Sequence, residues 1–245
     1  MNVAHLYAPP SAPTATAVPI RPARAFTAGE VLGAAWRSYK RQGFALSAST
    51  VLGYALIFGF DWMSGAAGGV LAMAVSGEPL PLVAAVAVLP HVANLLVGSF
   101  VSVGLYRVYL AAARGEEVRA SMLCSGGDAL LSMTGASLLV LFATLVSMIA
   151  LIVPGIVVSL ALSNALWLVA DRRASAVESL GLSFRTTRGL RLRLLGLGFA
   201  SGLVLLLGLL ALGVGVLVAL PVIMLASAHA YLRMIGEDPS AIAAV

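Results

Sequence analysis

Four polar side chains inside long apolar stretches are the residues of this chain whose types and spacing could do chemistry. His91 and Asn94 share one helical face, and Asn164 and His229 lie in later apolar stretches. Polar side chains in a membrane segment are costly, so each marks a functional contact or a hydrogen bond between helices. We expect intramembrane polar contacts with neighbouring helices at these positions, or contacts with a transported ligand at His91, Asn94 and Asn164.

A haem or metal ion shared by the two histidines would be the most specific chemistry. His91 lies 16 residues from Arg107, and His229 lies four residues from Arg233. If both arginines mark the inner boundary, the histidines differ in depth by about 18 Å at 1.5 Å per residue. Metal–nitrogen bonds are about 2 Å long, so one metal cannot bind both.

Catalytic patterns are absent from the sequence. There is no HExxH, no GxSxG and no glycine-rich phosphate loop, and the predicted spans contain no acidic residue. The single cysteine, Cys124, excludes an intramolecular disulfide and every cysteine-based zinc pattern. We therefore expect no catalytic residue, no metal and no cofactor, and a protein that is not an enzyme.

The composition indicates the class of protein to which the chain belongs. Of the 245 residues, 60% are hydrophobic and 10% are charged, and the mean hydropathy is +1.01. Soluble domains carry about 25% charged residues. The low charge excludes a soluble enzyme, a disordered chain and a nucleic-acid partner, despite a pI of 9.9. These exclusions leave an integral membrane protein as the expected class.

The charge-free intervals predict an all-α bundle of six transmembrane helices, because a crossing needs about 20 apolar residues. Pro154-Gly155 and Gly213-Val-Gly215 provide turns inside the two longest intervals. We interpret 62–77, which is rich in glycine and alanine, as an external loop or a short re-entrant helix. The expected spans cover residues 43–61, 82–108, 130–152, 155–170, 193–212 and 216–234 of a membrane domain at 26–238.

The basic residues predict the orientation of the chain. All fifteen Lys and Arg fall in segments that six spans place on one side, which the positive-inside rule makes cytoplasmic. Both termini are then inside, and Glu78 is outside. Residues 1–25 contain five prolines and predict a disordered cytoplasmic tail, and residues 239–245 form a C-terminal tail. The expected location is the bacterial cytoplasmic (inner) membrane.

Two capping boxes predict interface helices at 28–42 and 176–189. Thr27-Ala-Gly-Glu30 and Ser175-Ala-Val-Glu178 each begin an amphipathic segment. The segments 27–40 and 175–188 align without gaps, with five identities, and each leads into two spans that end in Tyr-Leu and a later Gly-Glu. We infer a parallel internal repeat, although two capped amphipathic helices could also have acquired similar residues independently.

The same residues resemble a family. The first amphipathic helix, the Arg-Gly-Glu segment at 114–116, the Pro-Gly turn, Asp171 after span four and the final Tyr-Leu-x-x-x-Gly-Glu are similar to those of uncharacterised bacterial six-helix membrane proteins. That set is similar to the membrane domain fused to some glycerophosphodiester phosphodiesterases. The resemblance covers about residues 26–238 and implies the six-helix fold. It implies no catalytic or binding residue, because the phosphodiesterase domain is absent.

We therefore expect a non-enzymatic membrane module that acts in lipid-linked or envelope processes or as a partner-binding subunit. A small permease for a neutral or lipid-like solute, with its path between the repeat halves, is the alternative. The expected partners are anionic membrane lipids at the cytoplasmic face and a protein partner or a second copy. Gly98-x-x-x-Ser102 and Gly198-x-x-x-Gly202 predict close packing within the chain or a homodimer. The expected headgroup contacts are Arg185, Arg188, Arg191 and Arg193.

Overall fold

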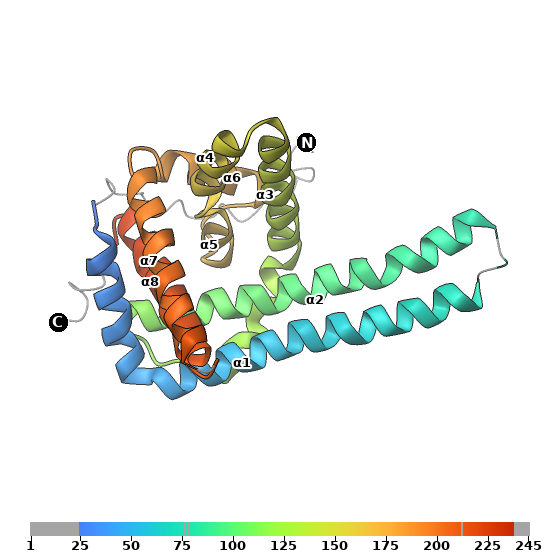
Figure 1. The fold of residues 1–245 in the computed structure, drawn as a ribbon, viewed down its shortest axis with the longest axis horizontal. Helices are drawn as coiled ribbons and strands as arrows, with labels where there is room; N and C mark the ends of the chain where they lie inside the picture. Colours follow the sequence, from blue (N-terminus) through green and yellow to red (C-terminus); the bar gives the residue numbers. More distant parts are fainter. Residues whose placement is uncertain (1–24, 76, 78, 212, 238–245) are drawn as a thin grey trace, which may run out of the picture.

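The computed structural model describes residues 25–75, 77, 79–211 and 213–237. These residues are helical and contain no strand (Figure 1). Six stretches are long and apolar enough to cross a membrane, which confirms the predicted number of candidate spans. The predicted tails at 1–25 and 239–245 lie outside the described residues, apart from Ala25. The elements are α1 (Ala28–Ala74), α2 (Leu80–Arg114), the 3-10 helix η2 (Ala120–Ala129), α3 (Leu130–Ala150), α4 (Ile152–Leu162), α5 (Ala165–Ala170), α6 (Ala176–Thr186), α7 (Arg191–Leu210) and α8 (Val216–Met234).

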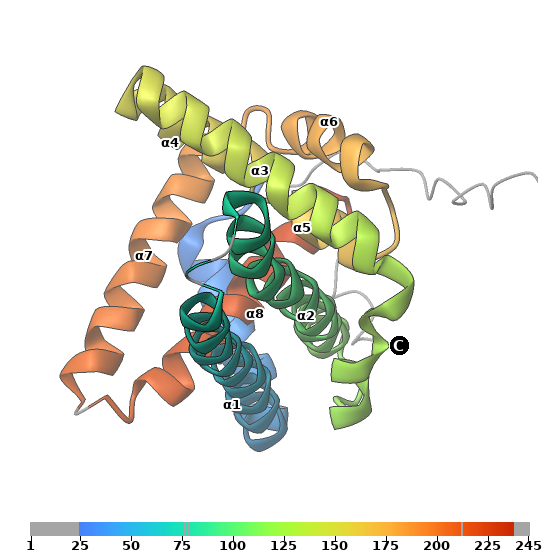
Figure 2. The same cartoon turned by 90° about the vertical axis from the view of Figure 1, so that its right-hand side faces the viewer.

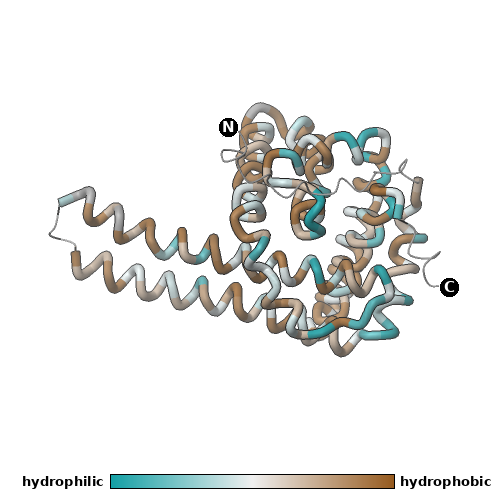
Figure 3. The backbone as a smooth tube through the Cα atoms, turned by 180° about the vertical axis from the view of Figure 1, so that it is seen from behind, coloured by the Kyte–Doolittle hydropathy of each residue, from teal (hydrophilic) through white to brown (hydrophobic). Residues whose placement is uncertain are grey.

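The candidate spans form three hairpins that diverge from a common base. The pairs are α1 with α2, α3 with α4 and α5, and α7 with α8, and their tips point in three directions (Figures 1 and 2). Hydrophobic residues recur along the hairpins, whereas hydrophilic ones gather around the base (Figure 3). The core also lies at the base, where it includes Val31, Leu46, Tyr109, Leu168 and Leu225.

Helix α1 is longer than the sequence predicts. It bends at Gln42, whose φ of −136° is not helical, and then continues to Ala74. The loop or re-entrant helix expected at 62–77 is therefore wrong. No proline interrupts 62–74, and its glycines let α2 approach, because a Cβ at Gly68 would lie 2.9 Å from the ring of Pro90. The resulting α1–α2 hairpin projects far beyond the other helices (Figure 1).

The turn between α3 and α4 also differs from the prediction. Leu151 has extended backbone angles and separates the two helices, whereas Pro154 and Gly155 lie inside the first turn of α4. Proline fits there because the first amides of a helix have no intrahelical partner. The expected turn at Pro154-Gly155 is therefore wrong by three residues. The turn expected at Gly213-Val-Gly215 is confirmed, and Gly213 has a φ of 77°.

The two small-residue motifs do not bring helices together within this chain. A Cβ added at Gly98, Gly198 or Gly202 would meet no atom within 4 Å among the described neighbours. The expected close packing at these glycines is therefore wrong, and the homodimer alternative stays a prediction. Close approach occurs elsewhere, where Gly104 of α2 lies against the backbone of Leu123 in η2.

Candidate functional site

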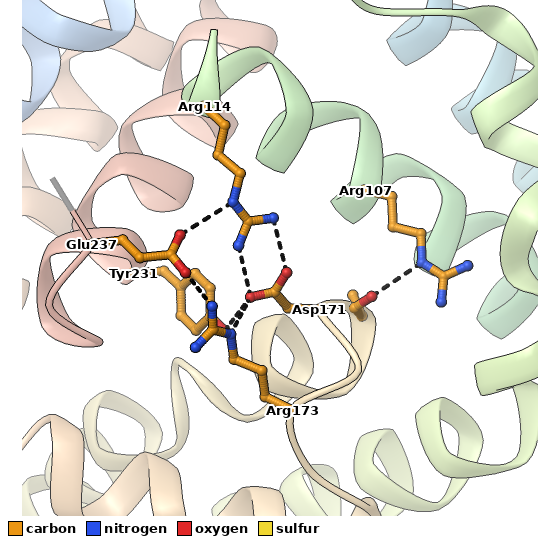
Figure 4. Close-up of polar contacts among 7 residues, drawn as sticks. Arg107, Arg114, Asp171, Arg173, Tyr231 and Glu237 are labelled. Atoms are coloured by element: carbon orange, nitrogen blue, oxygen red, sulfur yellow. Dashed lines mark hydrogen bonds and ion pairs between the residues drawn. The ribbon is translucent and has the colours of Figure 1, made fainter. Parts of the chain in front are cut away.

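Five side chains form an ion-pair cluster where the three hairpins meet. Arg114 ends α2, Asp171 and Arg173 follow α5, and Tyr231 and Glu237 come from the end of α8 (Figure 4). We call this group the base cluster. It joins residues separated by up to 123 positions in the sequence.

The Asp171 carboxylate is the centre of the base cluster. Arg114 binds it through both terminal nitrogens at 2.9 Å. The Nε of Arg173 donates to it at 2.6 Å, and the Tyr231 hydroxyl donates at 3.0 Å. Glu237 accepts from Arg114 at 3.2 Å and also pairs with Arg173. The Asp171 side chain is only 9% exposed, so these are largely desolvated contacts.

The chain reverses in the same way at the end of each contributing helix. Gly115, Arg172 and Gly236 have positive φ values of 85°, 57° and 82°. In each case the next residue donates its N–H to the carbonyl five residues earlier, which is a Schellman turn. Arg172 is the only non-glycine residue with a positive φ among those described, a conformation that costs about 1 kcal/mol or more. The turn after α5 places Asp171 and Arg173 beside α2 and α8.

Aromatic stacking positions the tyrosine of the base cluster. Trp167 of α5 stacks on Tyr231 with ring centroids 6.1 Å apart, and Tyr106 of α2 meets the edge of Trp167 at 4.5 Å. Tyr231 and Trp167 are both buried. The rings fix the direction of the Tyr231 hydroxyl toward Asp171, so packing and ion pairing support the same contact.

The base cluster is electrically balanced. Two arginines face two carboxylates, and each charged group has partners of opposite sign. Burial lowers the pKa of the Arg173 guanidinium, but the hydrogen bond and charge of Asp171 outweigh it and raise the pKa overall. The arginines therefore stay charged, and the cluster joins three helix ends.

A second ion-pair group lies beside the base cluster. Arg107 of α2 binds Asp128 of η2 through two nitrogens at 2.9 Å, and Arg172 binds the same carboxylate at 2.6 Å. Arg107 also donates to the carbonyl of Ala170 at 3.0 Å and to the carbonyl of Ser125. These contacts hold η2 against α2 and the end of α5.

An open cavity of about 380 Å³ separates the two groups of ion pairs. Its charged walls include Arg107, Arg114 and Arg172, each of which already binds a carboxylate. Asp171 and Glu116 also line the cavity, so its wall carries negative as well as positive charge. The arrangement therefore favours a structural role for the three arginines.

His91 and Asn94 lie on the projecting hairpin. The Nδ1 of His91 bonds the Ala87 carbonyl of its own helix at 3.0 Å. Asn94 donates to Asp61 of α1 at 2.6 Å, and its Oδ1 is buried without a described partner. Because α1 continues to Ala74, Asp61 lies within a candidate spanning helix. Asp61 stands at the end of the predicted span 43–61, and the expectation that no acidic residue lies inside a span stays a prediction.

Asn164 and His229 are buried and contact other helices. The Nε2 of His229 lies 3.0 Å from the Ser38 hydroxyl of α1. Asn164 lies at the break between α4 and α5, where its backbone N–H donates to the Ser183 hydroxyl at 3.1 Å. Ser183 in turn donates to the Ala161 carbonyl at 2.8 Å. Helix α6 thus supplies polar partners for the broken helix.

Replacing Ser183 with alanine should destabilise this break. The backbone N–H of Asn164 would be left buried without its Ser183 acceptor, at a cost of about 1–3 kcal/mol, whereas the Ala161 carbonyl would keep the hydroxyl of Thr187 at 3.2 Å. Thermal unfolding in detergent measures the loss. Ser163→Ala is the matched control, because Ser163 is exposed and bonds only the Leu160 carbonyl of its own helix. Equal effects of the two substitutions would contradict the role assigned to Ser183.

The four arginines expected at lipid headgroups differ in their surroundings. Arg185 and Arg188 are exposed and make no ion pair or side-chain hydrogen bond with any described residue. Arg193 donates to the Phe26 carbonyl at 2.9 Å, and Arg191 lies over the ring of Phe184 at 4.5 Å. Arg193 therefore holds α7 to the chain before α1, and the other three surround the turn between α6 and α7.

The histidines and carboxylates do not gather into a metal centre in the described part of the chain. No group of three or more His, Cys, Asp or Glu side chains there could hold a metal ion. Comparisons with family models, curated proteins and solved structures found no match. The resemblance to phosphodiesterase-linked membrane domains therefore stays a prediction.

The base cluster was not predicted as a site, although the sequence contained a signal for it. Arg114, Asp171, Tyr231 and Glu237 belong to three of the segments that carry the family resemblance. Each lies at the end of an apolar stretch on the side rich in arginine. Opposite charges that recur at the same ends of several spans predict ion pairs between those ends, and that signal would have found the cluster.

Proposed function

We propose that this chain is a non-enzymatic module of the bacterial cytoplasmic membrane that acts in lipid-linked or envelope processes. The observation that carries the proposal is the spacing of polar contacts along the α1–α2 hairpin. Gln42 binds the Glu116 carbonyl and the Val118 amide at 2.8 and 2.7 Å, and Asp61 binds Asn94 further along. Hydrophobic residues recur along the hairpin between these contacts (Figure 3).

The two polar contacts are about one bilayer apart. Nineteen residues separate Gln42 from Asp61, and 22 separate Asn94 from Glu116. At 1.5 Å per residue these are about 28 and 33 Å, close to the hydrocarbon thickness of about 30 Å. We place Gln42 at the inner boundary, with both termini inside, and the Asp61–Asn94 contact at the outer boundary. The hairpin tip beyond Asp61 then extends past the outer face.

Two amphipathic segments would lie along the inner boundary. The first is the part of α1 before Gln42, and the second is α6; both have the complete capping box. The hydrogen bond from the Ser175 backbone N–H lowers the pKa of the Glu178 carboxyl, so this carboxyl of the α6 capping box stays ionised. Trp36 and Phe184 are about half exposed at matching positions. This match, with the equivalent turns after α2 and α8, supports a parallel repeat.

The orientation can be tested by thiol labelling. In a Cys124→Ser background, we expect an impermeant thiol reagent applied to intact spheroplasts to label Gly77→Cys and to leave Arg185→Cys unlabelled. The reason is that every basic segment lies on the cytoplasmic side. Permeabilised cells, in which both positions should react, are the control. Labelling at 185 without labelling at 77 would refute the orientation.

A further inference from the structure

The corner between α6 and α7 carries positive charge without a matching acid. We define the corner by Phe184, Arg185, Arg188 and Arg191. The nearest acid on α6, Glu178, is engaged by the amide and hydroxyl of Ser175 at 3.1 and 2.9 Å. Because Arg185 and Arg188 are exposed and have no described partner, the corner presents at least two guanidinium groups to a ligand.

Arg191 contributes a donor that the protein leaves unsatisfied. Its Nε is buried and has no hydrogen-bond partner among the described residues, while its guanidinium carbon lies 4.5 Å from the centre of the Phe184 ring. Burying a charged donor without an acceptor is unfavourable. The stacked ring of Phe184 fixes the plane of the guanidinium, whose other nitrogens have no hydrogen bond or ion pair with a described residue.

The start of α7 adds further donors at the same place. Arg191 is the first residue of this 20-residue helix, and Leu190 at its N-cap makes no side-chain hydrogen bond. The first amides of α7 therefore lack a capping side chain. Free amides and the positive end of the helix dipole favour a bound phosphate, and Arg191 is the first residue of this helix.

Large apolar side chains surround these donors. Leu192 is 83% exposed and Phe184 is 49% exposed. A free phosphate would gain nothing from these side chains, whereas a lipid would bring acyl chains to them. Donors for phosphate beside exposed apolar side chains match the chemistry of a phospholipid at the membrane boundary.

We infer that the α6–α7 corner binds the phosphodiester of an anionic lipid. Arg188, Arg191 and the first amides of α7 bind the phosphate, and Phe184 and Leu192 contact the acyl chains. The inference rests on the proposed function, since it requires the corner to lie at the inner membrane boundary. It adds the identity of the ligand and the residues that bind it.

Native mass spectrometry of the full chain in detergent tests this site. The protein is titrated with phosphatidylglycerol and, separately, with phosphatidylcholine, and the lipid-bound fraction is measured. We expect Arg188→Gln with Arg191→Gln to weaken phosphatidylglycerol binding at least about tenfold, because each arginine near an anionic surface strengthens binding about fivefold. Arg191→Lys keeps the charge but loses the planar guanidinium, so it should give an intermediate loss.

The matched control removes the same charge elsewhere. Arg41 is exposed, and Arg119 is 74% exposed, with its nearest carboxylate 3.8 Å away. Arg41→Gln with Arg119→Gln should leave phosphatidylglycerol binding within about twofold of the parent. Equal weakening by both double variants, or parent binding no stronger for phosphatidylglycerol than for phosphatidylcholine, would overturn the inference.

Two further measurements separate the remaining explanations. An excess of inorganic phosphate should leave the bound phosphatidylglycerol in place, and displacement would identify a free phosphate site instead. Thermal unfolding should show that the Arg188 and Arg191 variants remain folded. If the double variant does not fold, the binding of phosphatidylglycerol to Arg191→Lys tests the site instead. If phosphatidylglycerol binding does not change as expected while the thiol labelling does, the lipid site is rejected and the proposed module is unaffected.

Discussion

Replacing Asp171 with asparagine is expected to lower the free energy of unfolding by about 3–5 kcal/mol, because Arg114 and Arg173 would then share the single carboxylate of Glu237 and one positive charge would lose its partner. Asp171 accepts hydrogen bonds from Arg114, Arg173 and Tyr231. An asparagine has one acceptor oxygen and no charge, so it cannot replace these contacts. The loss corresponds to a fall of about 6–20 °C in the midpoint of thermal unfolding.

Thermal unfolding of the purified protein in detergent measures this effect, and Asp128→Asn provides the comparison. Asp128 also binds two arginines, but its side chain is 42% exposed, against 9% for Asp171. Solvent screens the Asp128 pairs, so its replacement should cost about 1 kcal/mol. A larger loss for Asp128→Asn than for Asp171→Asn would show that the base cluster is not the centre of stability.

Gly104→Ala should have an effect of similar size through a steric mechanism. A Cβ at Gly104 would lie 2.6 Å from the Cα of Leu123, which is backbone and cannot rotate away. Helix η2 would have to move from α2, and the contacts of Arg107 with Ser125 and Asp128 would be lost. Overpacking of this kind costs about 3 kcal/mol, at the upper end of the usual range.

Gly98→Ala in the same helix is the matched control for Gly104→Ala. A Cβ at Gly98 meets no atom within 4 Å, so alanine should stabilise α2 by about 0.5–1 kcal/mol through its helix propensity. The two variants should therefore shift the unfolding midpoint in opposite directions. If Gly104→Ala is as stable as the parent in the same detergent, the close approach of η2 to α2 is wrong.

The sequence was sufficient to predict the helical class and six candidate spans, because both follow from hydropathy and from the cost of burying charge. It also predicted the turn at Gly213, where a short uncharged connection had to occur. The turn at Pro154 was misplaced, because proline breaks a helix only beyond its first turn. The length of α1 was missed because its apolar residues 62–74 have no charge or proline that decides between a helix and a loop.

The site was harder to predict, because its residues meet only after the hairpins form. Arg114 and Glu237 are too far apart in sequence for any helical or strand period to relate them. The stacking of Trp167 on Tyr231 likewise depends on how α5 packs against α8. Individual span ends can be read from one sequence, whereas the pairing of those ends requires the tertiary arrangement.

The order in which the base cluster is synthesised affects how the protein matures. Arg114 leaves the ribosome first, Asp171 and Arg173 follow, and Glu237 emerges last, after all six candidate spans. Until then Arg173 has only Asp171 as a described partner, and α8 contributes the Tyr231 hydrogen bond to Asp171 but not yet the two ion pairs of Glu237. A nascent chain that stalls or is cleaved before position 237 would contain every apolar segment and still lack this final connection. Membrane proteases that degrade incompletely assembled proteins could then distinguish it from the finished protein.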